Sequence, residues 1–346
     1  MFNSDTASAR PSRHTHKGMG MKGKNSMASL RQVVATVAWA GFSVSVGAAS
    51  YENCAVQVVD RAGASMEQVE FNALNDRGAV TGDRKYKSPN NLILVWKDGA
   101  ITRKLSRPLQ NEWGIAGLDI ANDGTVAGHD GGRGLTWKGS TVTWLAEPGE
   151  VAYPKAINQK GQMAGHCNGA CWWPTATQRV QLSNDYASWV NDINDSARMV
   201  GRDFNGSGQV PSYWFENQTV HLSANHGEAF SINNPGAVVG QVCNDDSCSR
   251  RSAFKWTNAG LVLLNSPAPD QDAAALSIND AGDIVGHTGG FDKQAVLWQN
   301  NQPRLLNELS CVQGAGWVLY EATRVNKSGQ IFGKGDKGYF LLTPLP

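Results

Sequence analysis

Hydrophobic and polar residues alternate along this chain in short runs, and the same arrangement of runs recurs seven times after residue 50. Each copy contains the same motif: an apolar residue and Asn, a short turn, Gly, a polar residue, two apolar residues and a closing Gly. The closing glycines lie 46, 37, 36, 39, 46 and 47 residues apart, at Gly82, Gly128, Gly165, Gly201, Gly240, Gly286 and Gly333. A period near 40 residues that is built from short β-type runs is typical of propellers and β-solenoids.

Each repeat contains four short runs, which in the sixth copy are residues 274–278, 283–286, 294–298 and 303–306. They are rich in β-branched and apolar residues and are bounded by Asn, Asp and Gly, which predicts strands joined by hairpins. Asn caps such turns with its own side chain, and Gly supplies a positive φ. The third run carries Trp96, Trp137, Trp173, Trp214, Trp256 and Trp298. We expect these to form the core between adjacent sheets, with ligand stacking as the alternative.

The seventh repeat has only three runs because the chain ends at Pro346, and a spare run lies at residues 54–60. A last blade completed by the N-terminal strand leaves no long open edge. The prediction is therefore an all-β fold, a seven-bladed β-propeller of four-stranded blades closed by that strand, within one domain at residues 51–346. An open solenoid would need polar capping repeats, and neither end resembles one.

Loop lengths distinguish the two faces of such a propeller. The interval from the closing Gly to the Trp ranges from 8 to 16 residues, and that from the fourth strand to the next repeat from 10 to 19. In an up-and-down blade these two connections emerge on the same side. Variable loops on a rigid scaffold are the usual form of a binding surface, so we expect ligands on this face.

Two sets of candidate binding residues lie there. The first strands begin with Glu70, Tyr153, Trp189, Glu228 and Glu321, and His129, His166 and His287 follow closing glycines. Aromatic rings stack on the apolar faces of sugars and carboxylates accept hydroxyl protons, while two suitably spaced carboxylates hydrolyse glycosides. The alternatives are a solvated polar rim and histidines that make local hydrogen bonds. No HxH or HExxH spacing accompanies these three histidines, so we predict neither a metal nor a cofactor.

Residues 1–50 differ in kind from the repeats. Six basic residues and one acidic residue precede an apolar run at 33–47 and the small residues Ala48-Ala49-Ser50, which is the order of a secretory signal peptide. We predict a secreted or periplasmic protein with no stable membrane span after cleavage; an uncleaved anchor is the alternative. Without these residues the net charge falls from +1 to −4, which argues against a nucleic-acid partner.

All six cysteines follow residue 50, and an even number in an exported chain favours disulfides. Cys167–Cys171 and Cys243–Cys248 fit disulfides within variable loops, and neither spacing is CxxC. By elimination Cys54 pairs with Cys311, but these two are expected at opposite faces. Either the loop 307–318 folds down the outer rim, or both cysteines stay unpaired.

The repeat phrase, followed by Ala, two apolar residues and Trp, resembles the HAF family of predicted extracellular repeat proteins. The similarity is clearest at residues 277–298, 231–240, 253–256 and 339–344. The His of the family's His-Ala-Phe signature is replaced by Ser252 and Gln294. The resemblance implies an exported bacterial repeat protein with a propeller fold, and it transfers no catalytic residue.

These patterns favour an exported, non-catalytic propeller that binds a glycan or protein ligand through its variable-loop face. One alternative is a glycoside hydrolase or lyase that uses Glu70, Glu228 or Glu321 with a histidine at the channel mouth. The other is a purely structural envelope protein. The first is preferred because the sequence contains no complete catalytic constellation.

Overall fold

The computed structural model describes residues 49–59, 69–84, 91–106, 108, 114–216 and 218–346. The predicted signal peptide lies almost wholly outside the described residues, as do parts of the first blade's variable loops. Within these ranges, no helix has both the length and the apolar character needed to cross a membrane.

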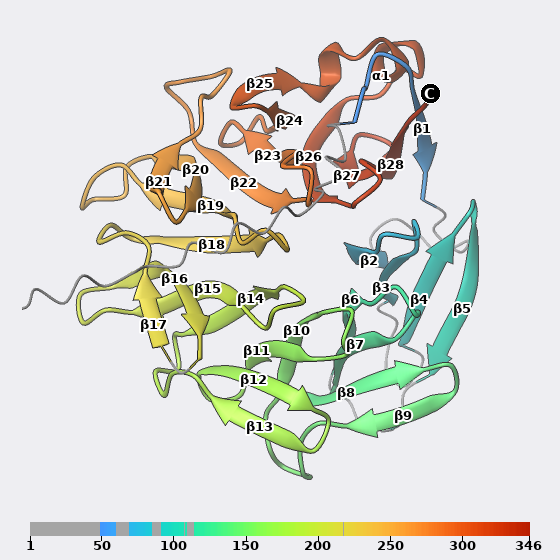
Figure 1. Ribbon diagram of the computed structural model, residues 1–346. Coiled ribbons are helices and arrows are strands. Elements are labelled where there is room, and N and C mark those ends of the chain that lie inside the picture. Colours follow the sequence, from blue (N-terminus) through green and yellow to red (C-terminus); the bar gives the residue numbers. More distant parts are fainter. Residues whose placement is uncertain (1–48, 60–68, 85–90, 107, 109–113, 217) are drawn as a thin grey trace, which may run out of the picture. The chain divides into compact units, whose positions relative to one another are not determined.

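Each repeat forms one antiparallel sheet of four strands, and the seven sheets are arranged in a ring (Figure 1). A cavity lined by residues of their first strands marks a central channel. Blades 1 and 2 consist of β2 (Val69–Leu74), β3 (Val80–Arg84), β4 (Leu92–Lys97), β5 (Ala100–Ser106), β6 (Ile115–Ile120), β7 (Val126–Asp130), β8 (Arg133–Lys138) and β9 (Thr141–Trp144). Blades 3 and 4 consist of β10 (Tyr153–Ile157), β11 (Met163–His166), β12 (Ala170–Thr175), β13 (Gln178–Gln181), β14 (Trp189–Ile193), β15 (Met199–Phe204), β16 (Gln209–Phe215) and β17 (Gln218–His221).

Blades 5 and 6 consist of β18 (Gly227–Ile232), β19 (Val238–Cys243), β20 (Arg251–Thr257), β21 (Gly260–Leu263), β22 (Ala273–Ile278), β23 (Ile284–Thr288), β24 (Gln294–Gln299) and β25 (Gln302–Leu305). The short helices η2 (Leu306–Glu308) and α1 (Ser310–Gly314) follow. Blade 7 consists of β26 (Leu319–Val325), β27 (Ile331–Gly335), β28 (Gly338–Pro344) and β1 (Cys54–Val58). The first strands are innermost, because those of neighbouring blades contact each other all round the ring, including β2 with β26.

The N-terminal strand closes the ring as predicted. β1 pairs antiparallel with β28, from Cys54 opposite Pro344 to Val58 opposite Phe340, and the two strands lie side by side in Figure 1. The strand ends at Val58, slightly before the predicted limit. The seven-bladed propeller closed by the N-terminal strand is therefore confirmed.

All three predicted disulfides form, and the path of one loop explains the pairing that was left open. Cys311 lies on α1, which packs beside β1, and its Cα atom is 5.6 Å from that of Cys54. The connection between blades 6 and 7 thus folds against the outer strand, with Leu309 and Val312 buried in the core at the blade 6–7 contact. The other two disulfides join Cys167 to Cys171 and Cys243 to Cys248.

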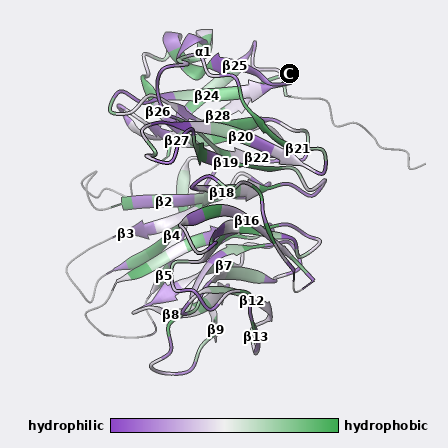
Figure 2. Cartoon of the chain, turned by 90° about the vertical axis from the view of Figure 1, so that its left-hand side faces the viewer, coloured by the Kyte–Doolittle hydropathy of each residue, from purple (hydrophilic) through white to green (hydrophobic). Residues whose placement is uncertain are grey.

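Hydrophobic clusters fill the contacts between neighbouring blades, one cluster at each contact. Third-strand tryptophans are their largest members, and Trp96, Trp137, Trp173, Trp214 and Trp298 are at most 2% exposed. In blades 5 and 7, Phe254 and Phe340 are the fully buried aromatics instead, while Trp256 is half-buried beside Tyr213. Strand β4 contributes four residues to two of these clusters and is mostly hydrophobic in Figure 2. The predicted core role is confirmed for five of the six tryptophans, whereas Trp256 lies at the edge of its cluster.

A β-bulge in every first strand explains the closing glycines. The register between first and second strands shifts by one residue at the same point in all seven blades, as between Ala229 and Ser231. The bulge brings the first strand so close that a Cβ atom on any closing Gly would lie 1.9–2.1 Å from a backbone carbonyl oxygen. The turn glycines supply a positive φ, whereas the closing glycines are required because no side chain fits at their positions.

The repeated Asn does more than cap its own turn. Its Oδ1 accepts backbone N–H groups of the turn, as Asn233 does from Ala237 at 2.8 Å. Its Nδ2 donates to the backbone carbonyl of the equivalent residue in the next blade, as Asn233 does to Asn279 at 2.9 Å. We call the donors the Asn ring: Asn75, Asn158, Asn194, Asn233, Asn279 and Asn326. The ring is interrupted at Ala121 in blade 2.

Candidate functional site

The two sets of candidate residues are cross-strand neighbours at the variable-loop end of the channel. In each blade, the residue that begins the predicted first-strand run pairs with the residue after the closing Gly. We call these seven pairs the mouth ring: Glu70–Asp83, Ala116–His129, Tyr153–His166, Trp189–Arg202, Glu228–Gln241, Ala274–His287 and Glu321–Lys334. All eight predicted site residues belong to it.

Aromatic side chains from blades 2, 3 and 4 meet in one arc of this ring. The Tyr153 ring lies 4.9 Å from His129, edge to face, and 5.9 Å from Trp189 in a stacked arrangement. His166 stacks on Trp189 with ring centroids 4.1 Å apart, and its Nε2 lies 3.1 Å from the carbonyl oxygen of Tyr186. Within this arc His129, Tyr153 and Trp189 are half-buried and His166 is fully buried, while the neighbouring Tyr186 is exposed.

Charged groups adjoin this platform in blades 4 and 5. Arg202 donates to both carboxylate oxygens of Glu228 at 3.2 Å, and its guanidinium lies 6.0 Å from the Trp189 ring. Asn191, the bulge residue of β14, donates to Glu228 at 2.8 Å. The Glu228 carboxylate is thus fixed by two donors beside the aromatic face.

The opposite arc carries mainly charged groups. The Glu321 carboxylate lies 3.5 Å from the ammonium of Lys293 and 3.9 Å from Nε2 of His287. Glu70 pairs in register with the buried Asp83 in blade 1. The structure therefore does not bring the three predicted glutamates together, because they belong to different blades and at least Glu228 and Glu321 have separate partners.

Burial keeps the three histidines uncharged at neutral pH. Desolvation lowers the pKa of His129 to about 4, against the opposing effect of Asp130. Desolvation and then Lys293 lower the pKa of His287 to about 4, and desolvation lowers that of His166. Nδ1 of His166 and of His287 is buried without a hydrogen-bond partner among the residues that the structure describes. No cluster of three or more His, Cys, Asp or Glu that suits a metal ion occurs among the described residues.

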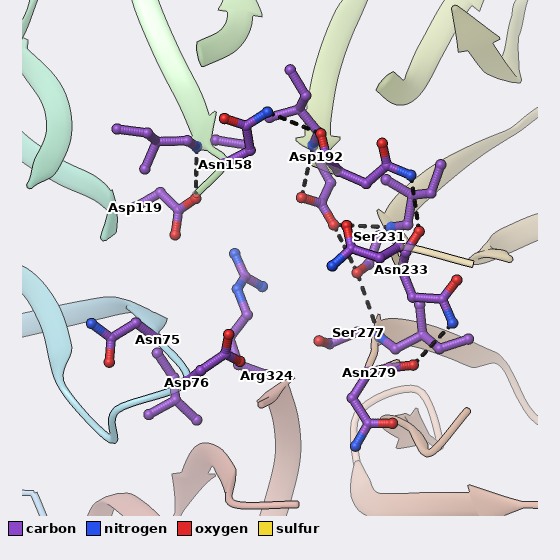
Figure 3. A pocket seen from close by; sticks show the side chains of 18 of the residues that line it. Asn75, Asp76, Asp119, Asn158, Asp192, Ser231, Asn233, Ser277, Asn279 and Arg324 are labelled. Atoms are coloured by element: carbon purple, nitrogen blue, oxygen red, sulfur yellow. Dashed lines mark hydrogen bonds between the residues drawn. The ribbon is translucent and has the colours of Figure 1, made fainter. Parts of the chain in front are cut away.

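Sequence reasoning missed a second site, which lies inside the channel at the Asn-turn end. A cavity of about 370 Å³ extends from the turns to the bulge residues, among them Lys155 and Asn191. Asp119, Asp192 and Arg324 line it, one residue after the bulge in their strands (Figure 3). The available signal was a polar residue at this position in several repeats.

The two channel carboxylates link neighbouring blades. Asp119 accepts the backbone N–H of Ile157 in the next blade at 2.8 Å, and Asp192 accepts that of Ile232 at 2.9 Å. Desolvation raises the pKa of Asp119 to about 6 and also raises that of Asp192, although these hydrogen bonds oppose the shift. Ser277 makes the corresponding link to Val325. These side chains hold the inner strands together.

No family model matches the chain, and no curated protein matches it. Many solved structures do, and they share the propeller fold. The extracellular domain of a proposed hybrid two component system from B. thetaiotaomicron is similar with 11% identity and a TM-score of 0.54, over 84% of this chain and 40% of that one. An acylaminoacyl peptidase from Pyrococcus horikoshii has 9% identity and a TM-score of 0.50, over 78% of this chain and 49% of that one. This chain therefore spans less than half the length of either, and identities this low show the fold alone.

Proposed function

We propose that this chain is an exported, non-catalytic propeller that binds a glycan through the mouth ring. The observation that carries the proposal is the stack of Tyr153, Trp189 and His166 beside the Arg202–Glu228 pair. Aromatic faces pack on the apolar C–H faces of a sugar ring, and the adjacent charged and amide groups exchange hydrogen bonds with its hydroxyls. Binding sites commonly combine an apolar surface with a few fixed polar groups in this way.

A glycoside hydrolase fits the geometry less well. Hydrolysis by the usual mechanism requires two carboxyl groups on either side of the scissile bond, one of them able to donate a proton. Glu228 is paired with Arg202, and Glu321 contacts Lys293 in a different arc of the ring. The neutral histidines are poor proton donors, because desolvation favours their uncharged form.

Export rests on the cysteines and on the resemblance to the HAF family. All six cysteines are paired in three disulfides, and such bonds persist in oxidising compartments. The extracellular setting of one similar propeller is consistent with this proposal. Membership of the HAF family stays a prediction, because no family model matches.

Binding should be tested with a panel of neutral and acidic oligosaccharides in a thermal-shift assay, since a ligand that binds the folded state raises its stability. Trp189→Ala should weaken binding of the best oligosaccharide about tenfold or more, the effect expected of a central aromatic contact. Trp144→Ala is the matched control, because Trp144 is a half-buried tryptophan on the outer strand β9 under Arg133. Equal loss in both variants would contradict the proposed site.

Glu228→Gln separates binding from catalysis. Under our proposal the wild-type chain releases no product from a bound oligosaccharide, and the variant changes only the affinity. Product release by the wild type that disappears in Glu228→Gln, with binding retained, would establish a hydrolase instead.

A protein ligand is the second candidate, favoured by exposed aromatics at variable loops. Tyr186 and Phe204 are 69% and 43% exposed, and Phe291 in the β23–β24 connection is fully exposed. Large apolar side chains in such positions often mark protein contacts. If the glycan panel gives no stabilisation, capture of a partner that is lost in Phe291→Ser would support this candidate.

A further inference from the structure

The channel cavity at the Asn-turn end has the form of a separate ligand site. Its rim is formed by turn residues that include Asp76, Asp280 and Lys327, and its walls reach the bulge residues Lys155 and Phe230. It lies at the end of the channel away from the mouth ring, because the Asn turns follow the first strands and the mouth ring begins them. Its volume of about 370 Å³ falls at the lower end of the range of small-molecule pockets.

Two cationic side chains extend into this cavity. The guanidinium of Arg324 projects into its centre (Figure 3), and its only hydrogen bond to a described residue runs from Nη1 to the carbonyl oxygen of Thr323 at 2.9 Å. Lys155 lines the inner part and makes no hydrogen bond or ion pair within the described ranges. Burial, together with Arg324, lowers the pKa of Lys155. An anion in the cavity would stabilise both charges.

The neighbouring carboxylates do not neutralise these cations by direct contact. Asp119 accepts the backbone N–H groups of Ile120 and Ile157, each at 2.8 Å. Asp192 accepts a backbone N–H from its own strand and two donors from the next blade. Neither forms an ion pair with Arg324 or Lys155 in the part of the chain that the structure describes. The remaining N–H groups of the guanidinium are therefore available to a ligand.

We propose that this cavity binds a small organic monocarboxylate of single-sugar size, such as a hexuronate, through Arg324 and Lys155. A guanidinium presents a planar fork that matches a carboxylate with two parallel hydrogen bonds, and an ammonium adds a point charge. Asp119 and Asp192 balance the charges of Arg324 and Lys155, and Asp76, Asp195 and Asp280 outnumber Lys327 at the rim, so no excess positive charge is left for a phosphate dianion. A monocarboxylate is held instead by the directed N–H groups of Arg324. The carboxylate oxygens of Asp76 and Asp280 at the rim each accept one hydrogen bond within the protein and keep a second lone pair for a sugar hydroxyl. The cavity adjoins the mouth ring at one point, because Asn191 lines the cavity and also donates to Glu228.

The test is isothermal titration of the full chain with glucuronate, glucose and inorganic phosphate. We expect saturable binding of glucuronate and affinities at least about tenfold lower for glucose and phosphate, in keeping with charge-assisted recognition. Arg324→Met should abolish glucuronate binding, and Arg324→Lys should weaken it about tenfold because the fork is lost. Trp189→Ala should leave it unchanged, since this residue belongs to the mouth ring.

Two further measurements are needed: one covers a variant that fails to fold, and the other identifies the source of the ligand. If Arg324→Met does not fold by circular dichroism, Lys155→Met decides, with the same expected loss. An oligosaccharide that ends in glucuronate distinguishes a polymer end from a free sugar acid as the natural ligand: binding of both indicates a polymer end, and binding of the free acid alone indicates a metabolite. Absence of glucuronate binding, equal affinity for glucose, or full affinity in a folded Arg324→Met chain would overturn the inference.

Discussion

Replacing Asn233 with alanine should destabilise the propeller without touching the mouth ring, although Asn233 also lines the channel cavity. The change removes the Asn ring's link to blade 6, the bond from Nδ2 to the Asn279 carbonyl, and the turn cap on the Ala237 N–H. Asn233 is buried, with 6% of its surface exposed, so water does not readily replace these partners. Two hydrogen bonds lost with partners left unpaired should cost about 2–4 kcal/mol in the free energy of unfolding.

Urea unfolding followed by tryptophan fluorescence measures this cost, because the core tryptophans report on the blade contacts. Asn258→Ala is the matched control: Asn258 is an exposed turn residue of the same blade and makes no hydrogen bond to any described residue. It should change stability by less than about 0.5 kcal/mol. The reverse change, Ala121→Asn, should add about 1 kcal/mol by filling the gap in the ring. A value for Asn233→Ala within error of the control would refute the role of the ring.

Three further substitutions test the close backbone approach at a closing glycine, the positive φ of a turn residue and the burial of a histidine. Gly240→Ala would place a Cβ atom 2.1 Å from the Glu228 carbonyl oxygen, so it should lower the free energy of unfolding by more than about 4 kcal/mol or prevent folding. The control Gly290→Ala meets open space and should leave stability unchanged in the same urea assay. Ala197→Gly should raise the unfolding free energy by about 0.5–1 kcal/mol, because Ala197 has a φ of 56° where other blades have Gly. The pKa of His129 is lowered to about 4, so its stabilising contribution is complete above about pH 6.5 and is lost as the pH falls towards 4; in His129→Gln, stability measured against pH should fall less steeply across this window.

Repetition made the fold predictable. Seven copies of one phrase define the blades, and the missing fourth strand of the last copy indicates closure by residues near Cys54. The mouth ring was partly predictable as well. The two sets of candidate residues were recognised separately, although each strand start lies 12 residues before a closing Gly and each histidine lies one residue after it. Counting across the hairpin would have paired them.

The channel site was missed because of the bulge, although a polar residue occupies its position in several repeats. Strand patterning assumes that side chains alternate with a period of two, and one extra residue reverses the face of every side chain beyond it. Arg324 and Asp192 therefore occupy the channel, although alternation alone did not assign them there. The path of the loop to Cys311 was equally undetermined, because it depends on the packing of α1 against β1.

The most direct test of the proposed function is a hydrogen–deuterium exchange footprint of the chain with the neutral oligosaccharide that stabilises it most. We expect slower exchange at the beginnings of β10, β14 and β18, around Tyr153, Trp189 and Glu228, and in the variable loops beside them. Protection confined to the Asn turns, or no protection with any neutral oligosaccharide, would contradict glycan binding at the mouth ring.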